Sequence, residues 1–401
     1  MTRQTEEQLT PAAVVCVDGL GINGLGIVRS LGRRGIPVYV VGVNHHLDLA
    51  ASSRYCGKKI EIEDVDGDAL YHALTILADK SGSRPVLFFD NDRMMNALGP
   101  HAEAVEKKFR VTSPLRNMKE LSCKRFQISV ARSIGLAVPD TWYPGTWDEL
   151  YAIDTDGRTR FIAKPASEAY PFHKPFKVMT GDNIPQLADR LKARVGSPEG
   201  LIIQKYIEGP DSQIYVALGY KSFGTEFCEV ITGIKTCQSC PGAGVMAVGR
   251  AKDSGTVRRM TRDLISALNY SGIIGVEYKY STTDGKYYFI EISPRAELFH
   301  TLGAKAGFDL PFMAYRDVAG IQQMEPLAIR RDAGHYWICF RSDMVSLLMS
   351  RRNGNYRRFF EPYLGEKEWA VYASDDLVPW IRSVQNFASS YISALFLKIC
   401  K

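Results

Sequence analysis

The segment 272–295, GIIGVEYKYSTTDGKYYFIEISPR, restricts the possible folds of this chain more than any other stretch. It has the pattern of two β-strands in which apolar and polar residues alternate, with a turn at Asp284-Gly285 between them. Each strand carries one carboxylate of interest, Glu277 in the first and Glu291 in the second. A three-residue loop with Gly285 in the left-handed conformation would place these glutamates directly opposite each other on one face of the hairpin.

Facing carboxylates indicate a cation site. Two such groups about 5 Å apart repel each other unless a cation lies between them. Oxygen ligands suit Mg²⁺ or Mn²⁺, and Mg²⁺ usually completes its octahedron with water and substrate phosphates. Arg295 follows the second strand at once, where a guanidinium can bind a phosphate. The alternative is that one glutamate pairs with Lys279 or Arg295 and that no metal binds.

The motif EYKY…FIEISPR resembles the metal-binding hairpin of the ATP-grasp superfamily, whose usual form is E…EINPR. The resemblance covers roughly residues 12–320 and is most similar to the carboxylate–amine ligase branch, the predicted ATP-dependent carboligases. It implies an α/β protein in three parts. These are an N-terminal, Rossmann-like parallel-sheet domain that precedes the ATP-grasp unit (1–112), a two-part α+β ATP-grasp domain (113–322) and a small C-terminal α/β extension (323–401).

The resemblance also assigns a metal site and catalytic residues. It implies that Glu277 and Glu291 bind Mg²⁺ and that Ser293 stands where the family usually has an asparagine ligand. A hydroxyl can reach Mg²⁺ directly or through water. Arg295 and Lys235 match basic residues that contact the phosphates during transfer, so they are the candidate catalytic residues.

Lysines provide the candidate phosphate contacts. Lys164 lies in the apolar strand FIAKP, where a lysine must find an anion because burying it unpaired is costly. The resemblance matches Lys164 to the lysine that contacts the α- and β-phosphates of ATP, and it matches Lys124 to a second phosphate-directed lysine. It also places the phosphate-covering loop at 167–178, with Lys174 and Lys177 as candidate clamps.

The segment QKYIEGPD (204–211) resembles the linker that holds the adenine. By this resemblance the backbone of residues 205–207 reads the edge of the base, and an acid at the end of the segment binds the ribose hydroxyls. Glu208 is a second candidate for the ribose contact. The implied nucleotide-binding residues of this segment are Gln204, Lys205, Tyr206, Ile207 and Asp211.

The N-terminal sequence predicts a βαβ unit in a parallel sheet. An apolar strand, AAVVCVDG, runs into glycines at 19, 21 and 24, then a helix and a second strand at 36–44. A dinucleotide site would need an acidic residue at the end of that second strand, but Val43-Asn44 stands there. NAD binding is therefore not expected. The glycines either let backbone N–H groups approach a substrate anion or close a tight turn.

A third apolar strand, PVLFFD (85–90), ends in Asp90-Asn91-Asp92. Polar residues at the carboxyl end of a parallel strand lie where α/β proteins bind ligands. We expect Asp92 to cap the helix that follows, and Asp90 or Asn91 to contact a substrate.

Composition and charge exclude several classes of protein. The net charge of +6 comes without a long basic block, which is not the footprint of a nucleic-acid-binding protein. The eight cysteines are scattered, which predicts reduced thiols in a cytoplasmic protein, and Cys237-x-x-Cys240 lacks the second pair of a zinc ribbon. The polar N-terminal segment has no apolar core, so we expect no signal peptide, and no apolar stretch is long enough for a transmembrane helix.

The C-terminal segment predicts an amphipathic helix. Apolar residues recur there at helical spacing, at Ile381, Val384, Phe387, Tyr391 and Leu395. We expect this stripe to pack on its own domain or on a second subunit of a homodimer. Binding to a membrane surface is the less favoured alternative, because few basic residues lie beside the stripe.

The function implied by the resemblance is an ATP- and Mg²⁺-dependent ligase that joins a small carboxylate to a small amine through an acyl phosphate. An amino acid or short peptide is the family-level expectation for the substrate. Two alternatives stay open. One is an ATP-grasp protein that binds nucleotide without ligating, which Ser293 makes conceivable; the other is an NAD(P)-binding oxidoreductase, which the glycine pattern at 19–24 alone would suggest.

Overall fold

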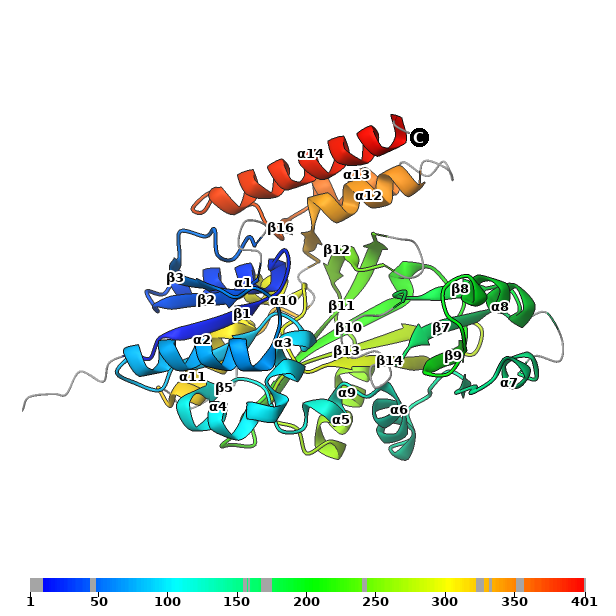
Figure 1. Ribbon diagram of the computed structural model, residues 1–401, viewed down its shortest axis with the longest axis horizontal. Coiled ribbons are helices and arrows are strands. Elements are labelled where there is room, and N and C mark those ends of the chain that lie inside the picture. Colours follow the sequence, from blue (N-terminus) through cyan, green and yellow to red (C-terminus); the bar gives the residue numbers. More distant parts are fainter. Residues whose placement is uncertain are drawn as a thin grey trace, which may run out of the picture.

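The computed structural model consists of three β-sheets with helices packed around them (Figure 1). A parallel sheet formed by the N-terminal part lies on one side, a large sheet occupies the centre, and a small antiparallel sheet lies on the other side. The mixed α/β class with an N-terminal parallel sheet is as predicted. The structure describes residues 10–43, 48–153, 157, 159–166, 175–239, 244–321, 328–331, 334–350 and 357–399.

The N-terminal sheet has five parallel strands in the order β3-β2-β1-β4-β5. Its strands are β1 (Ala13–Val17), β2 (Val38–Gly42), β3 (Cys56–Glu61), β4 (Val86–Phe89) and β5 (Arg110–Val111). Its helices are α1 (Ile22–Gly32), α2 (Gly67–Lys80), α3 (Asp92–Ala97), η1 (Gly99–His101) and α4 (Ala102–Lys108). Strand β1 is buried along its whole length, as expected for a central parallel strand, and the predicted βαβ unit is confirmed.

The glycine turn after β1 is shaped by close packing. Gly19 and Gly21 have positive φ angles of 78° and 61°. A Cβ on Gly21 would lie 2.5 Å from Val17 Cγ1, and one on Gly24 would lie 2.7 Å from Val17 Cγ2. Of the two explanations for this pattern, the tight turn therefore has structural support. The expected position of a ribose-binding acid includes Asn44, which lies outside the described residues.

The central sheet has seven strands in the order β14-β13-β10-β11-β12-β15-β16, and the small sheet has four in the order β6-β9-β7-β8. The central strands are β10 (Ile214–Lys221), β11 (Cys228–Gln238), β12 (Met246–Ala251), β13 (Gly272–Tyr280), β14 (Tyr287–Ser293), β15 (Tyr336–Ile338) and β16 (Lys367–Trp369). The small sheet contains β6 (Thr141–Trp142), β7 (Phe161–Pro165), β8 (Met179–Gly181) and β9 (Leu201–Lys205). The remaining helices are α5 (Met118–Leu121), α6 (Lys124–Ser133), α7 (Trp147–Tyr151), α8 (Ile184–Lys192), η2 (Asp211–Gln213), α9 (Gly255–Ala267), α10 (His300–Lys305), α11 (Leu310–Ala319), α12 (Phe340–Ser350), α13 (Arg357–Leu364) and α14 (Val378–Ile399).

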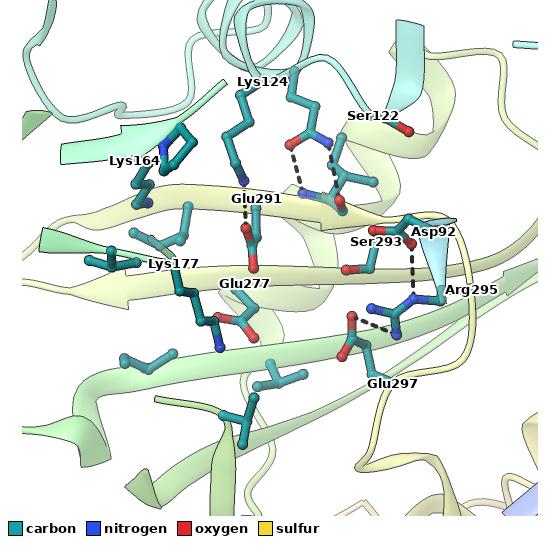
Figure 2. A pocket seen from close by; sticks show the side chains of 18 of the residues that line it. Asp92, Ser122, Lys124, Lys164, Lys177, Glu277, Glu291, Ser293, Arg295 and Glu297 are labelled. Atoms are coloured by element: carbon teal, nitrogen blue, oxygen red, sulfur yellow. Dashed lines mark hydrogen bonds and ion pairs between the residues drawn. The ribbon is translucent and has the colours of Figure 1, made fainter. Parts of the chain in front are cut away.

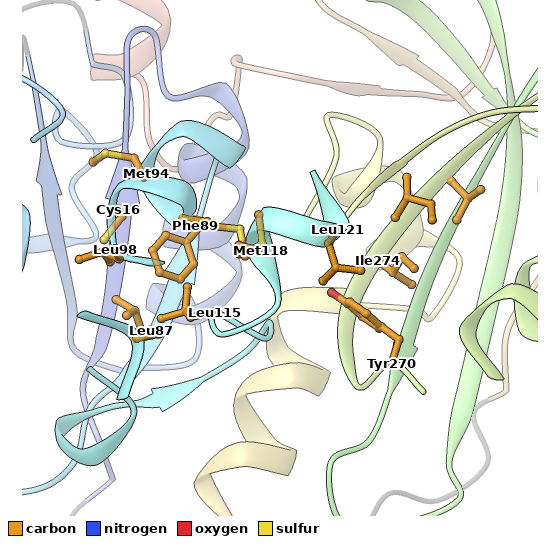
Figure 3. Close-up of a cluster of buried hydrophobic side chains, with 14 of the residues drawn as sticks. Cys16, Leu87, Phe89, Met94, Leu98, Leu115, Met118, Leu121, Tyr270 and Ile274 are labelled. Atoms are coloured by element: carbon orange, nitrogen blue, oxygen red, sulfur yellow. The ribbon is translucent and has the colours of Figure 1, made fainter. Parts of the chain in front are cut away.

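One hydrophobic core joins the N-terminal sheet to the central sheet (Figure 3). Helix α5 bridges the two, because Met118 lies beside Phe89 of β4 while Leu121 lies beside Tyr270. The predicted boundary at residues 112 and 113 falls in this region, so the first two predicted domains share their packing. The domain boundaries themselves stay a prediction.

The C-terminal part extends the central sheet and is anchored to the N-terminal part. Strand β15 pairs antiparallel with β12 and parallel with β16. Asp376 is only 2% exposed, and its carboxylate accepts hydrogen bonds from Arg29 Nε at 2.9 Å and Ser53 Oγ at 2.7 Å. This buried contact fixes the start of the last helix against α1.

Helix α14 confirms the predicted C-terminal helix and lies along the outer edge of the molecule (Figure 1). Its predicted apolar stripe is only partly covered, because Ile381 is 46% and Val384 is 44% exposed. The side chains of Tyr391 and Leu395 lie outside the described residues. None of the described helices is both long and apolar enough to cross a membrane.

Candidate functional site

A cleft of about 1210 Å³ lies between the central sheet and the small sheet, with α3 of the N-terminal part at one end. Most of the described candidate residues that the sequence singled out line it: Lys124, Lys164, Gln204, Lys205, Tyr206, Ile207, Asp211, Lys235, Glu277, Glu291, Ser293 and Arg295. Lys177 lines it too. Lys174 lies outside the described residues, as does Cys240.

The hairpin β13–β14 places Glu277 directly opposite Glu291, as predicted. Both carboxylates point into the cleft (Figure 2). The side chain of Glu277 is 17% exposed and that of Glu291 is 38% exposed, so both keep access to a ligand. The hairpin therefore presents a pair of acidic groups at the floor of a large cavity.

The predicted three-residue loop is wrong, although Gly285 is left-handed with φ of 70°. Ser281 N–H donates to the Lys286 carbonyl at 2.8 Å, which closes a four-residue loop over 282–285. The longer loop shifts the register of the outer hairpin by one residue. A bulge at Ile290 shifts it back, so the glutamates still face each other.

Each glutamate is held by a lysine from another element, and Figure 2 shows the lysine that holds Glu291. Lys124 Nζ, at the start of α6, lies 2.7 Å from Glu291 Oε2, and Lys235 Nζ of β11 lies 2.6 Å from Glu277 Oε1. The Lys124 charge holds the pKa of Glu291 well below its usual value. The sequence alternative named Lys279 as a partner, but its Nζ donates to the backbone carbonyls of residues 209 and 210 instead.

Lys164 of β7 faces the same cleft. Among the described residues no carboxylate lies within ion-pair distance of its ammonium group, whereas Lys124 and Lys235 are both paired. Burial, together with the nearby Lys124 charge, lowers the pKa of Lys164 to about 8. A half-buried cation with no carboxylate partner in the described part of the chain favours the binding of an anion.

The linker after β9 forms one wall of the cleft. Gln204 is 4% exposed and its Nε2 donates to Thr141 Oγ1 at 3.1 Å. The N–H of Lys205 donates to the carbonyl of Asp140 at 2.9 Å, and that of Tyr206 to the carbonyl of Arg160 at 2.8 Å. These bonds tie the linker to the small sheet, while residues 204–207 line the cleft.

The two predicted ribose-binding acids have different surroundings. Asp211 lines the cleft, and its carboxylate accepts hydrogen bonds from the N–H of Gln238 at 3.1 Å and from its Nε2 at 2.9 Å. Glu208 is an exposed residue whose carboxylate lies 3.8 Å from Arg160, and it does not line the cleft. The geometry therefore favours Asp211.

Arg295 is the centre of a charge network at the N-terminal end of the cleft (Figure 2). Its Nε donates to Asp92 Oδ1 at 2.9 Å, and its Nη1 lies 3.5 Å from Glu297 Oε1. These acids keep the pKa of Arg295 above its usual value in spite of burial. The guanidinium is thus fixed in one orientation by two carboxylates.

The expected helix cap at Asp92 is wrong. Asn91 is the N-cap of α3 and accepts a hydrogen bond from Met94 N–H at 3.0 Å, which frees Asp92 to bind Arg295. Asp90 is 5% exposed and, like Asn91, does not line the cleft. Burial and the nearby Asp48 hold the pKa of Asp90 well above its usual range.

The family model described as "Carbamoyl-phosphate synthase L chain, ATP binding domain" matches residues 249–325, which include the β13–β14 hairpin. This part of the chain is similar to that family, and the chain as a whole has an ATP-grasp-like fold. No curated protein sequence matches the chain significantly.

Solved structures share the ATP-grasp fold over most of the chain. An ADP complex of N5-carboxyaminoimidazole ribonucleotide synthetase is 14% identical, with a TM-score of 0.61, and the match covers 82% of this chain and 81% of that chain. Biotin carboxylase from Campylobacter jejuni is 15% identical over 79% of this chain and 73% of that chain, with a TM-score of 0.59. The Staphylococcus aureus N5-carboxyaminoimidazole synthetase with ADP is 16% identical over 80% and 81%, with a TM-score of 0.60.

The donors of the ATP-grasp hairpin fit Mg²⁺. Glu277 and Glu291 offer facing carboxylate oxygens, and the hydroxyl of Ser293 lies on the same hairpin next to Glu297. In the described part of the chain no three His, Cys, Asp or Glu side chains converge on one point. The set therefore suits an ion that takes its other ligands from water and phosphates.

Sequence reasoning missed two residues of this ATP-grasp site. Asp92 was assigned to capping, although its place after a parallel strand was a signal for a role in the site. Glu297 lies two residues after Arg295 in the loop that follows β14, and burial raises its pKa. No periodic pattern marks a residue in such a loop, so only its proximity to Arg295 could have suggested it.

Proposed function

We propose that this chain is an ATP- and Mg²⁺-dependent ligase that joins a small carboxylate to a small amine through an acyl phosphate. The observation that carries the proposal is the convergence, in one cleft, of a facing glutamate pair, three largely buried lysines and Arg295 (Figure 2). Phosphoryl transfer depends mainly on positioning and on neutralising phosphate charge, and this set of groups supplies both.

The lysines of the cleft are the proposed contacts of the triphosphate. Lys164 has no carboxylate partner among the described residues, and binding to phosphate oxygens would keep its charge. Glu277 and Glu291, with Ser293, would hold Mg²⁺, which when bound supplies positive charge to the phosphates. Carboxylates engaged in this way attract Lys124 and Lys235 less strongly, so both ammonium groups can turn to the phosphates.

The linker after β9 is the proposed binding segment for the adenine and the ribose. Because the N–H groups of Lys205 and Tyr206 are committed to the sheet, we assign the edge of the adenine to the Lys205 carbonyl and the Ile207 N–H. Gln204 lies at the start of the linker, and Tyr206 is steadied by Arg160, whose guanidinium lies 4.2 Å from the ring centroid. Asp211 would accept from the ribose hydroxyls.

The reaction proceeds in two steps. A carboxylate oxygen of the substrate attacks the γ-phosphorus and ADP leaves; the amine nitrogen then attacks the carbonyl carbon of the acyl phosphate, phosphate leaves, and the nitrogen loses a proton. Arg295, held by Asp92 and Glu297, donates to the transferred phosphoryl group, with Lys235 beside it. Catalysis is then largely charge stabilisation by preoriented groups.

Solved relatives support the nucleotide assignment. Two of them are an ADP complex and a β,γ-ATP complex, and we extend nucleotide binding to this chain by analogy of fold. An amino acid or short peptide is our proposal for the substrate. We assign the N-terminal domain to 1–112, the ATP-grasp domain to 113–322 and the extension to 323–401.

Release of ADP and inorganic phosphate tests the proposal. Wild-type protein with ATP and Mg²⁺ should release phosphate only when pools of both amino acids and carboxylates are present. Glu291→Gln should abolish release, whereas Glu226→Gln, a fully exposed glutamate paired with Lys221, should not change it. ATP binding without any release from any pool would instead support a non-catalytic nucleotide-binding protein.

A further inference from the structure

A second cavity, of about 340 Å³, lies between the N-terminal part and the C-terminal extension; we name it the C-terminal cavity. Its walls include Leu20 of the glycine turn, Trp369 of β16, and Trp380 and Val384 of α14. It shares none of its described lining residues with the nucleotide cleft. It is therefore a separate site on the molecule.

The C-terminal cavity is apolar and open to water. Its floor is fully buried, with Ile338 exposed by 0% and Cys339 by 2%. On its rim Phe340 is 46%, Trp380 is 40% and Val384 is 44% exposed. Apolar side chains gathered around a hollow in this way gain free energy when an apolar group covers them.

Arg341 is the only charged side chain among the described residues that line the C-terminal cavity. In the part of the chain that the structure describes it has no carboxylate partner, whereas nearby arginines of the N-terminal part, Arg29 and Arg33, are paired with Asp376 and Asp375. An unpaired guanidinium beside an apolar hollow matches a ligand with an anionic head and an apolar body.

We propose that the C-terminal cavity binds a single-chain anionic amphiphile, an aliphatic carboxylate of medium length. Its chain packs against Trp369 and Trp380, and its carboxylate pairs with Arg341. The volume of about 340 Å³ is near the lower end of the ~300–1,000 Å³ of small-molecule sites, which suits one short chain. Because the site is a recess, a thin chain fills it better than a flat membrane surface does.

Titration of the full chain with decanoate tests the proposal, read by tryptophan fluorescence and calorimetry. Decanoate should bind saturably at one site per chain and quench the tryptophans that line the cavity. Decanol, with the same chain and no charge, should bind about tenfold more weakly or worse, because a charge-assisted pair is lost. Butyrate, which keeps the charge and lacks the chain, should not bind measurably.

Two variants assign the binding to this cavity. Arg341→Gln should weaken decanoate by about tenfold and leave decanol unchanged, and the retained decanol binding also shows that the variant is folded. Ser383→Trp should fill the hollow and abolish both ligands. Arg132→Gln, an exposed arginine on α6 outside the cavity, is the matched control and should bind as the wild type does.

Several results would overturn the proposal. If decanoate binding does not saturate, there is no defined site. If decanoate binds Arg341→Gln and Ser383→Trp as tightly as it binds the wild type, the site lies outside this cavity. Binding to phosphatidylglycerol vesicles without binding to free decanoate would make the cavity part of a membrane surface. A chain that is dimeric in solution, and binds decanoate only after Leu377→Ser and Val378→Ser make it monomeric, would assign the cavity to a second copy.

Discussion

The protonation state of Lys164 can be tested directly by measuring ATP binding as a function of pH. Lys164 is half-buried, faces the cleft and has a pKa lowered to about 8 by desolvation and by Lys124. Below this pH it is protonated and can bind phosphate. Above this pH the free protein has lost the charge, so phosphate binding requires the uptake of a proton.

The dissociation constant of ATP should therefore rise with pH. We expect it to be nearly flat from pH 6 to 7.5 and to increase by up to about tenfold per unit above pH 8. Lys164→Arg should remove this increase, because arginine stays protonated throughout. Calorimetric titration measures the dissociation constant of ATP for both proteins at each pH. Protonation of ATP affects both proteins equally, so the difference between the two profiles reports on Lys164. Parallel profiles would show that Lys164 does not contact phosphate.

Asp92 is predicted to act by positioning Arg295. Asp92→Asn weakens the hold on Nε, so the guanidinium becomes less well oriented and kcat should fall about tenfold while KM for ATP stays the same. Asp92→Glu should restore part of kcat. As a control, Asp79→Asn removes an exposed partner of Lys108 and should change neither constant. A rise in KM for ATP with kcat intact would assign Asp92 to nucleotide binding instead.

At the scale of residues, the sequence identified those side chains whose burial depends on their neighbours in the sequence. Lys164 in FIAKP and the glutamates on alternating strands were recognisable because burial follows from the pattern around them. The pairing of Lys124 with Glu291 was not, because the two residues are 167 positions apart. Which acid an arginine contacts likewise depends on packing between elements that no local pattern specifies.

Among the elements, the hairpin shows how a correct register can follow from an incorrect loop. The sequence predicted the facing glutamates together with a three-residue loop, and it gave no sign of a bulge. The additional loop residue and the bulge at Ile290 compensate each other. Loop length and bulges depend on tertiary contacts and twist, so alternating patterns do not determine them.

Gly285 gives a test at this scale. Its φ of 70° strains any side chain, although a Cβ would meet nothing within 4 Å. Gly285→Ala should therefore lower the free energy of unfolding by about 1 kcal/mol through backbone strain alone. Gly224→Ala, in another open loop without positive φ, should be neutral or slightly stabilising. Urea denaturation compares them, and equal effects would contradict the strain argument.

For the whole molecule, the C-terminal extension is tied to the N-terminal part by a buried ion pair. Arg29 is 5% and Asp376 2% exposed, and Ser53 also donates to the carboxylate. The sequence predicted a separate extension and gave no sign of this contact. Pairs almost 350 positions apart are set by the tertiary fold, as is the addition of β15 to the central sheet.

Breaking this pair should destabilise the molecule. Asp376→Asn leaves Arg29 buried with an uncompensated charge, and we expect a loss of about 3 kcal/mol. Asp375→Asn removes the neighbouring but exposed pair with Arg33 and should cost about 1 kcal/mol or less. Urea unfolding followed by circular dichroism measures both. Similar losses in the two variants would show that the buried pair has no special role.

The most direct test of the proposed chemistry follows the carboxylate oxygen. Amino-acid substrates labelled with ¹⁸O in the carboxylate are incubated with the protein, ATP and Mg²⁺, and the products are analysed by mass spectrometry. An acyl phosphate requires one labelled oxygen in each phosphate released, together with unlabelled ADP. Label in AMP, or phosphate released without label, would contradict an acyl phosphate and with it the proposed ligase mechanism.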